Sequence, residues 1–412
     1  MIACWPVRNA SRTLFCTAPW FLLATLLTGC DLDGYPDDLR YPPRTDVLVV
    51  DKPKVDAPRE LGFDRPGEFP KVILAGLPEK DKEQLIIDPA GLKDDQRSVL
   101  EDELSKRFGT PANPKADIGD AALVGQLKLD DETLRRGSTV YRQQCLHCHG
   151  LSGDGRGATA PWVNPHPRDY RQGVFKFTSS SQDEGRRKPR KDDLLRTLRE
   201  GIEGTSMPSF RLLPEDDLEA LASYVIHLSM RGEIEFQVIR ALVKGEETNV
   251  METLGAYLEL IRGNWQGAQT SMIKPPAYPG DTLKTEEERD KYLRESIARG
   301  LGLFARAQAE GNLKSAGCLG CHSDFGRQSA YKYDAWGTIV KPADLTTGVY
   351  RGGRRPIDLY WRIHSGINGV TMPASSSSLT PEEVWDVVNF LQVLPYPKMR
   401  EKYGIKLEQP PK

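Results

Sequence analysis

Two short stretches of the chain combine two cysteines and a histidine at a spacing that can hold a cofactor. Each is a C-x-x-C-H motif, at residues 145–149 and 318–322. This is the attachment signature of c-type haem, in which both thiols bond to the porphyrin and the adjacent histidine faces the iron. The sequence therefore predicts two covalently bound haem c groups. Their thioether cysteines are Cys145, Cys148, Cys318 and Cys321, and their proximal iron ligands are His149 and His322.

Other uses of these cysteines fit the spacing less well. A four-thiolate zinc site normally separates its C-x-x-C pairs by about 15–20 residues, whereas these two pairs lie in different halves of the chain. A redox dithiol of the thioredoxin type does not need the trailing histidine. The other three cysteines are Cys4, Cys16 and Cys30, so none is left for a structural disulfide in the body of the protein.

The chain after its first thirty residues contains an internal repeat, at residues 121–231 and 294–398. Both copies run through an R-G pair followed by an aromatic residue, the C-x-x-C-H motif, a P-x-D motif and a G-I-x-G-x-x-M-P loop. Both copies end in an amphipathic segment with helical spacing, which in the second copy follows the N-cap and first-turn pair Thr380 and Pro381. The repeat predicts two domains of the same fold.

The methionines of the two M-P loops, Met207 and Met372, are the candidate sixth ligands of the irons. A thioether is a soft ligand that stabilises ferrous iron. A methionine that only fills the core would be expected on an apolar helix stripe, not in a turn flanked by Ser or Thr. Histidines offer alternatives: His364 for the second haem, and His166 or His227 for the first.

The N-terminus has the pattern of a secretory leader. Arg8 and Arg12 precede a short apolar stretch that ends in L-T-G-C at Cys30. This ending resembles a bacterial lipobox, and an ordinary signal peptide with an incidental cysteine is the alternative. We expect residues 1–29 to be a lipoprotein signal peptide and Cys30 to be lipidated. The exported protein would then be anchored in the periplasm, on the outer face of the cytoplasmic membrane.

The remaining segments carry no second cofactor motif. Residues 30–120 are rich in Pro and charged residues and predict an extended arm with one helix over 94–108, either a spacer or a strap on a partner. Residues 232–293 predict a linker with helices, and 399–412 a C-terminal tail. With a net charge of −2 and 39% hydrophobic residues, the chain gives no reason to expect nucleic acid as a partner.

Basic residues gather after the haem motif in each repeat. The first repeat has a dense run over 186–191, and the second has arginines at 351, 354 and 355. Such runs are commonly solvated loops. The alternative is that they guide docking to acidic partners or neutralise haem propionates.

Taken together, these motifs resemble the class I cytochrome c family. The resemblance implies a mainly α fold: two class I cytochrome c-like helical domains joined by a helical linker and preceded by the arm. In that family a proline about twelve residues after the motif presents its carbonyl to the proximal imidazole, and Pro161 stands there in the first repeat. The second repeat has Asp334 at that offset, so the resemblance names no equivalent residue there.

Tandem domains of this kind on a lipoprotein look like the dihaem cytochromes of bacterial respiratory complexes. The resemblance implies a membrane-anchored carrier that relays single electrons between respiratory redox proteins, without independent catalysis. Two alternatives remain open. One is a haem enzyme of the peroxidase or nitrogen-oxide reductase type with one open iron, and the other is a permanent subunit of an oxidase or quinol-oxidising complex.

Overall fold

The computed structural model describes residues 34–51, 85–183, 186–306 and 314–407; Cys30 lies outside them. Helices dominate this part of the chain, which confirms the expected mainly α fold. Two small antiparallel sheets accompany them: β1 (Leu48–Val49) with β2 (Ile86–Ile87), and β3 (Lys332–Tyr333) with β4 (Ile339–Val340). None of the helices in these ranges is both long enough and apolar enough to cross a membrane.

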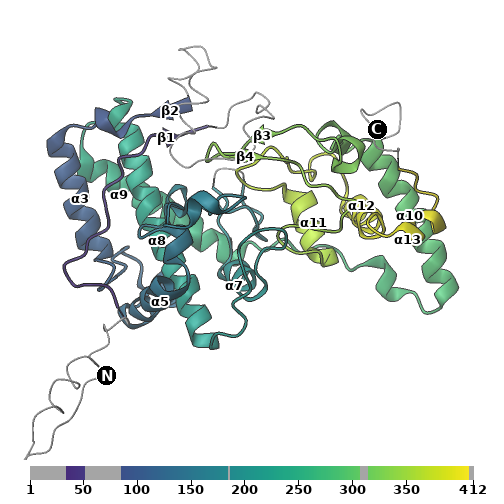
Figure 1. The fold of residues 1–412 in the computed structure, drawn as a ribbon, viewed down its shortest axis with the longest axis horizontal. Helices are drawn as coiled ribbons and strands as arrows, with labels where there is room; N and C mark the ends of the chain where they lie inside the picture. Colours follow the sequence, from purple (N-terminus) through teal and green to yellow (C-terminus); the bar gives the residue numbers. More distant parts are fainter. Residues whose placement is uncertain (1–33, 52–84, 184–185, 307–313, 408–412) are drawn as a thin grey trace, which may run out of the picture.

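Two lobes lie side by side in Figure 1. The first lobe contains α3 to α9, and the second contains α10 to α13. Each lobe is built on one pair of long helices that cross. These crossing helices are α5 (Asp131–Gln144) with α8 (Glu215–Val243), and α10 (Glu286–Ala305) with α12 (Pro381–Val393). The other α-helices are α3 (Asp94–Phe108), α4 (Ala121–Leu127), α6 (Leu146–His149), α7 (Lys191–Glu200), α9 (Val250–Thr270), α11 (Pro356–Ser365) and α13 (Pro397–Lys402).

Short 3-10 turns join these helices. They are η2 (Pro89–Gly91), η3 (Ala160–Trp162), η4 (Tyr170–Gln172), η5 (Pro279–Thr282), η6 (Cys318–Gly320) and η7 (Ser323–Gly326).

The helix crossing is the same in both lobes. Gly137 of α5 lies against the carbonyl of Ala220 in α8, and Gly300 of α10 lies against the carbonyl of Asp386 in α12. Only a residue without a Cβ allows the two backbones to approach this closely. The R-G pair of each repeat therefore marks the point at which its first and last helices meet.

Local sequence signals fix where these helices begin. Asp130 accepts a hydrogen bond from the backbone of Thr133 at the start of α5. Thr380 and Glu383 form a capping box before α12, with Pro381 at its first position, as the sequence predicted. Such caps satisfy backbone N–H groups that have no partner inside the helix.

The described part of the N-terminal arm packs on the chain's own first lobe. The predicted helix over 94–108 is confirmed as α3, which packs against α8 and α9. Further upstream, the hydroxyl of Tyr41 lies 2.9 Å from that of Tyr224. The backbone N–H of Arg44 donates to Glu235. The described residues of the arm are therefore part of the first lobe.

The boundary expected after residue 231 falls inside a continuous helix. α8 runs from Glu215 to Val243, so the start of the predicted linker is the end of the closing helix of the first repeat. α9 then folds back against α8. Arm, first repeat and most of the linker share one hydrophobic core, and the second repeat has its own.

The two lobes meet through equivalent residues of the two repeats. A Cβ at Gly204, in the M-P loop of the first repeat, would lie 2.6 Å from Val349 of the second. A Cβ at Gly369, the equivalent glycine of the second repeat, would lie 2.9 Å from Val174 of the first. Val174 and Val349 each stand seven residues after the proline of their P-x-D motif. The interface therefore has approximate twofold symmetry.

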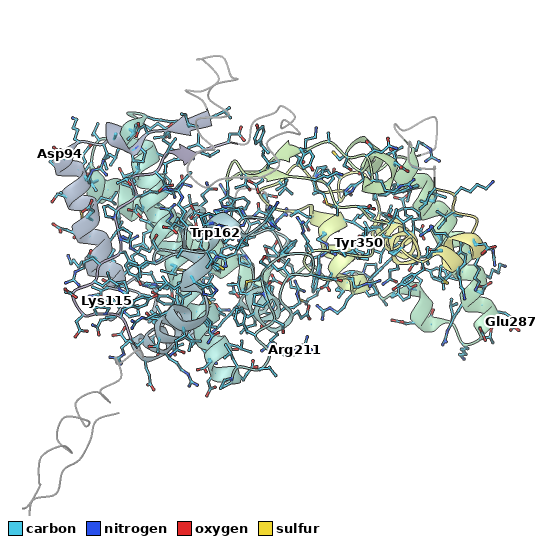
Figure 2. All side chains as sticks on the ribbon, in the orientation of Figure 1. Asp94, Lys115, Trp162, Arg211, Glu287 and Tyr350 are labelled. Atoms are coloured by element: carbon cyan, nitrogen blue, oxygen red, sulfur yellow. The ribbon has the colours of Figure 1, made fainter. Side chains whose placement is uncertain are left out.

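Helices α7 and α11 lie at the centre of this interface (Figure 1). The Arg196 guanidinium of α7 lies 5.1 Å from the ring centroid of Trp361 in α11, and Nη1 lies 3.0 Å from Asp358, which is 1% exposed. Arg187 adds a bond to the carbonyl of Ser365. Side chains from both lobes fill the space between them (Figure 2).

Candidate haem centres

One helical turn presents the first C-x-x-C-H motif. Cys145 directly follows α5, and α6 begins at the next residue. The backbone N–H of His149 donates to the carbonyl of Cys145, with 2.9 Å between the atoms. The second motif forms a similar turn, in which His322 donates to Cys318 over 2.8 Å. Each turn gathers both thiols and the imidazole within one short segment.

None of the four motif cysteines forms a disulfide. Burial raises the pKa of Cys145 to about 12 and that of Cys318 to about 11. A redox dithiol needs a thiolate at neutral pH, which requires a lowered pKa. Within the described ranges, no group of three or more His, Cys, Asp or Glu residues is arranged to hold a metal ion. The raised pKa values of these thiols therefore do not favour a redox dithiol.

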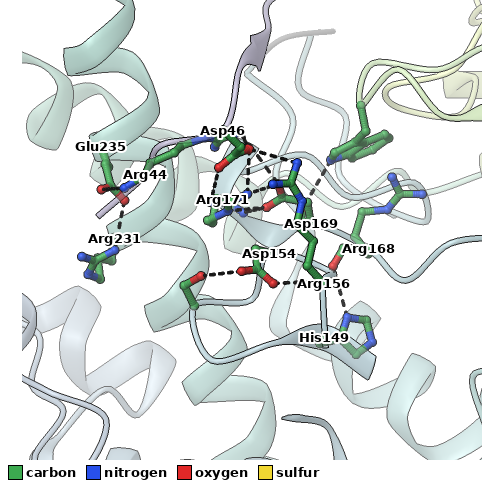
Figure 3. A network of polar contacts seen from close by, with 12 residues as sticks. Arg44, Asp46, His149, Asp154, Arg156, Arg168, Asp169, Arg171, Arg231 and Glu235 are labelled. Carbon is green, nitrogen blue, oxygen red and sulfur yellow. Dashed lines mark hydrogen bonds and ion pairs between the residues drawn. The ribbon is translucent and has the colours of Figure 1, made fainter. Parts of the chain in front are cut away.

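A backbone carbonyl orients each proximal histidine. Nδ1 of His149 lies 3.1 Å from the carbonyl oxygen of Arg168, as Figure 3 shows. Nδ1 of His322 lies 3.1 Å from the carbonyl oxygen of Ala343. Because each Nδ1–H donates to a carbonyl, the other ring nitrogen, Nε2, is left for an iron. Such a bond fixes the tautomer and raises the basicity of the ligand.

This arrangement corrects the role predicted for Pro161. Pro161 lies exposed in η3, and the carbonyl at the imidazole belongs to Arg168. Both supporting carbonyls belong to the middle residue of the P-x-D motif, in Pro167-Arg168-Asp169 and Pro342-Ala343-Asp344. The repeat contained this signal, and it supplies the second-domain equivalent that the family resemblance did not.

Burial keeps the proximal imidazoles neutral. It lowers the pKa of His149 to about 4 and moves that of His322 in the same direction. At neutral pH both rings therefore hold one proton, on Nδ1, and a lone pair on Nε2. A neutral imidazole is the form that binds a metal.

The M-P loops have the same backbone conformation in both repeats. The backbone N–H of Ile202 donates to the carbonyl of Met207 over 3.1 Å, and that of Ile367 donates to Met372 over 3.1 Å. Gly366 ends α11 with φ +71, and a Cβ there would lie 2.5 Å from the carbonyl of Met372. Both methionines are partly buried against the core of their own lobe. Their role as sixth ligands stays a prediction.

The structure separates the alternative histidine ligands. His227 is fully buried beneath the arm, where Nε2 lies 2.9 Å from the carbonyl of Phe108 and the ring packs on Tyr224. It is therefore engaged away from the haem motif. His364 is half-buried, with Nδ1 3.1 Å from the hydroxyl of Ser365, and His166 is also half-buried. These two remain alternatives.

The arm reaches the segment that supports His149. Arg171 donates to Asp169 and also to Asp46 of the arm, with an Nη1 to Oδ1 distance of 2.8 Å to Asp46 (Figure 3). Burial acts to raise the pKa of Asp46, but the adjacent Arg44 and Arg171 hold it well below its usual range. Asp46 is therefore a carboxylate that ties the arm to the P-x-D segment.

Most of the basic run of the first repeat is buried, although Arg186 is exposed. Lys188 is 1% exposed, and its Nζ lies 2.7 Å from Glu233 of α8. Lys191 donates to the carbonyl of Leu127 and pairs with Glu219. These cations are paired inside the protein because their neighbours in the fold are acidic. Lys188 and Lys191 therefore stabilise the first lobe.

The family comparison addresses the same two regions. A family model described as cytochrome C oxidase, cbb3-type, subunit III matches residues 132–225 and 305–391. Both regions are class I cytochrome c domains. The chain is therefore a haem c electron-transfer protein, with the tandem arrangement that the repeat predicted.

No curated protein matches the chain. A chain of the Kuenenia stuttgartiensis reducing HAO-like protein complex has a similar structure, with 22% identity and a TM-score of 0.43 over 63% of this chain and 95% of that one.

The residues of both cytochrome c domains fit a covalent haem. In each domain two cysteines outside any disulfide and a neutral, oriented imidazole share one turn. Cys145 and Cys148 with His149 would hold the group in the first domain. Cys318 and Cys321 with His322 would do so in the second. The haem supplies one-electron redox chemistry, and the chain supplies attachment, orientation and burial.

Proposed function

We propose that the protein is a dihaem cytochrome that relays single electrons between respiratory redox proteins, with one haem c in each domain. The observation that carries this proposal is the identity of the supporting geometry in the two repeats. Each has an imidazole held by the carbonyl of a P-x-D motif. Each also has a methionine loop closed by the same backbone hydrogen bond.

This geometry favours electron transfer over bond-making chemistry. With Met207 and Met372 as sixth ligands, neither iron would have an open position for a substrate. An enzyme of the peroxidase or nitrogen-oxide reductase type needs such a position. A closed, six-coordinate iron changes little on reduction, which suits the exchange of electrons with another protein.

Haem content and ligand binding test the proposal on the purified full-length protein. We expect a pyridine haemochrome assay to give two haems per chain, and a reductive titration to take up two electrons. We expect the reduced protein not to bind carbon monoxide unless it is denatured. One haem per chain, or a high-spin ferric band with carbon monoxide binding to the native protein, would contradict it.

We also propose that Cys30 carries a lipid that holds the protein at the outer face of the cytoplasmic membrane. The support is the L-T-G-C sequence after a short apolar stretch. An anchor of this kind would raise the effective concentration of membrane-bound partners. Replacing Cys30 with Ser should release or misprocess the protein, whereas Cys16→Ser in the same leader should not. Equal membrane retention of both variants would place the anchor elsewhere.

A permanent place in a larger respiratory complex is the second candidate. The observation that favours it is the description of the matching family model, which is that of an oxidase subunit. Purification of the native protein under mild conditions distinguishes the two. A carrier should elute alone, and a subunit should co-purify with its partners in a fixed ratio.

A further inference from the structure

Trp336 of the second domain contacts the segment of the first domain that supports His149. It occupies the turn between β3 and β4 and is 8% exposed. Its indole Nε1–H donates to the backbone carbonyl of Asp169 in the first domain, with 3.0 Å between the atoms. The guanidinium carbon of Arg168 lies 3.4 Å from the ring centroid. Both partners belong to the P-x-D motif of the first domain.

In the first domain, the residue bonded to Trp336 is next to the residue bonded to His149. The carbonyl of Arg168 accepts from Nδ1 of His149, and the carbonyl of the next residue, Asp169, accepts from Trp336. The two hydrogen bonds are therefore joined by one residue of backbone. A displacement of the indole would move the carbonyl that orients the proximal ligand.

In the second domain, the turn that contains Trp336 contacts the loop that carries Met372. The backbone N–H of Ala335 donates to the carbonyl of Gly369 over 2.7 Å. A Cβ at Gly369 would lie 2.7 Å from the indole ring of Trp336. Gly369 stands three residues before Met372 in the same loop. The turn is thus bonded to one ligand segment of each domain.

A buried ion pair holds the turn in this position. The carboxylate of Asp334, which is 0% exposed, accepts from the backbone N–H groups of Trp336 and Thr338. It also accepts from Lys176 of the first domain, whose Nζ lies 3.0 Å away. A buried and bonded turn of this kind has little freedom to move relative to either domain.

We propose that Trp336 is a positioning residue that couples the haem-ligand segments of the two domains. The inference rests on the proposed function, because it requires a haem in each domain. With a haem in each domain, the haems would supply one-electron exchange in which one iron is oxidised and the other reduced, and Trp336 would hold the ligand segments in place. No bond is made or broken and no proton moves.

The direction of the effect on the first haem follows from the hydrogen bond to His149. The Nδ1–H bond to Arg168 makes the imidazole a more basic ligand, which favours ferric iron. Without the indole donor, the segment from Arg168 to Asp169 would be held less firmly and this bond would weaken. The reduction potential of the first haem would then rise.

The matched pair of variants is Trp336→Phe and Trp361→Phe in the full-length haem protein. Trp361 also lies at the domain interface, also has an arginine near its ring, and also donates to a carbonyl, that of Ile273. Its carbonyl partner supports neither a proximal histidine nor a methionine loop. The readouts are the potential of each haem by spectroelectrochemistry and the rate of haem-to-haem transfer after photoreduction.

We expect Trp336→Phe to raise the potential of the first haem and to change the rate of internal transfer, while Trp361→Phe changes neither. An unchanged potential of the first haem in Trp336→Phe would overturn the inference, and so would equal shifts in both variants. If Trp336→Phe does not fold, Asp334→Asn is the second variant. It weakens the ion pair with Lys176 that holds the turn in place, and it should give the same shifts. Reversible uptake of two electrons by the unmodified protein tests the proposed function separately.

Discussion

A single backbone carbonyl orients each proximal histidine for binding a metal. One carbonyl, that of Arg168 or of Ala343, sets the tautomer of each ring. Burial then keeps the ring neutral. The side chain of the residue that supplies the carbonyl does not matter for this task, so the two repeats can place Arg and Ala at the same position. That freedom leaves the arginine side chain available for Trp336.

Replacement of either loop methionine should open one iron. We expect Met207→Ala and Met372→Ala each to remove the near-infrared methionine-to-iron band of one haem and to lower the potential of that haem, because a soft ligand that favours ferrous iron is lost. Absorption spectra and redox titrations measure both effects. Met399→Ala is the control, since Met399 also packs on the second core but lies in α13.

A different ligand in the second domain would give a different pattern. If Met372→Ala leaves the second haem unchanged while His364→Ala alters its spectrum, that haem has two histidine ligands. His166 would be examined in the same way for the first haem. The approximate symmetry of the two ligand loops would then not extend to their side chains.

His227 should make the stability of the protein depend on pH. Burial lowers its pKa to about 4 in the folded state, from 6.5. As the pH falls from 6.5 to 4, the unfolded chain takes up a proton that the folded chain does not, so stability is lost. The contribution is about 3 kcal/mol of the free energy of unfolding.

Chemical unfolding at a series of pH values measures this contribution. His227→Gln keeps an N–H donor for the carbonyl of Phe108 but cannot take up a proton. We expect the variant to lose less stability between pH 6.5 and 4 than the unmodified protein. Parallel curves for the two proteins would show that His227 does not control the acid sensitivity.

At the level of the elements, the two helix crossings depend on glycine. Gly137→Ala or Gly300→Ala would place a methyl group against the carbonyl of Ala220 or Asp386. We expect each to lower the free energy of unfolding by about 1–3 kcal/mol, because the helices must move apart. Gly302→Ala is the control in the same helix, where the nearest atom would lie 3.6 Å away.

Thermal or chemical unfolding distinguishes these variants. Gly302→Ala should be neutral or stabilising by up to about 1 kcal/mol, since alanine favours a helix over glycine. Equal effects of Gly300→Ala and Gly302→Ala would mean that helix propensity, and not the crossing, sets the cost.

Most elements that position the sites could be predicted from the sequence, because local signals specify them. Apolar spacing marked α3, and the Thr-Pro pair marked the start of α12. The end of the first domain could not be predicted in this way. The boundary expected after residue 231 lies inside α8, and a Cβ at Gly232 would lie 2.6 Å from Arg171. The role of Gly232 is close packing, which depends on a residue distant in the sequence.

The burial of the basic run and the carbonyl that supports His149 were not predicted either, because both depend on residues that only the fold brings together. Lys188 is charged, and a charged run is normally exposed, but Glu233 reaches it through the fold. Pro161 matched a family position, but the chain folds so that a later carbonyl meets the ring. The repeat of the P-x-D motif was visible in the sequence. Only the structure could connect it with the imidazole.

At the scale of the whole molecule, the domain interface should contribute to stability. Arg196→Ala removes a cation that pairs with the buried carboxylate of Asp358 across the interface. Asp358 keeps Arg355 as a partner, so we expect a loss of about 1–3 kcal/mol. Calorimetry should show the two lobes unfolding at more widely separated temperatures than in the unmodified protein.

Arg199→Ala provides the control one turn further along α7. Arg199 pairs with Glu215 at the surface, where both side chains are more than one-third exposed. Such pairs contribute less than about 1 kcal/mol. If Arg199→Ala and Arg196→Ala have the same effect on the unfolding of the two lobes, the interface pair does not join them.

The arm that crosses the first lobe also sets the order in which that lobe can be completed. Tyr41 meets Tyr224, and Arg44 meets Glu235, across separations of 183 and 191 residues. During synthesis these contacts must wait until α8 has been made, and contacts between distant residues form slowly. Cys145, which is 6% exposed in the finished fold, precedes α8 in the chain. The first pair of thiols is therefore made well before the structure that buries it, which leaves an interval in which they can be reached and bonded.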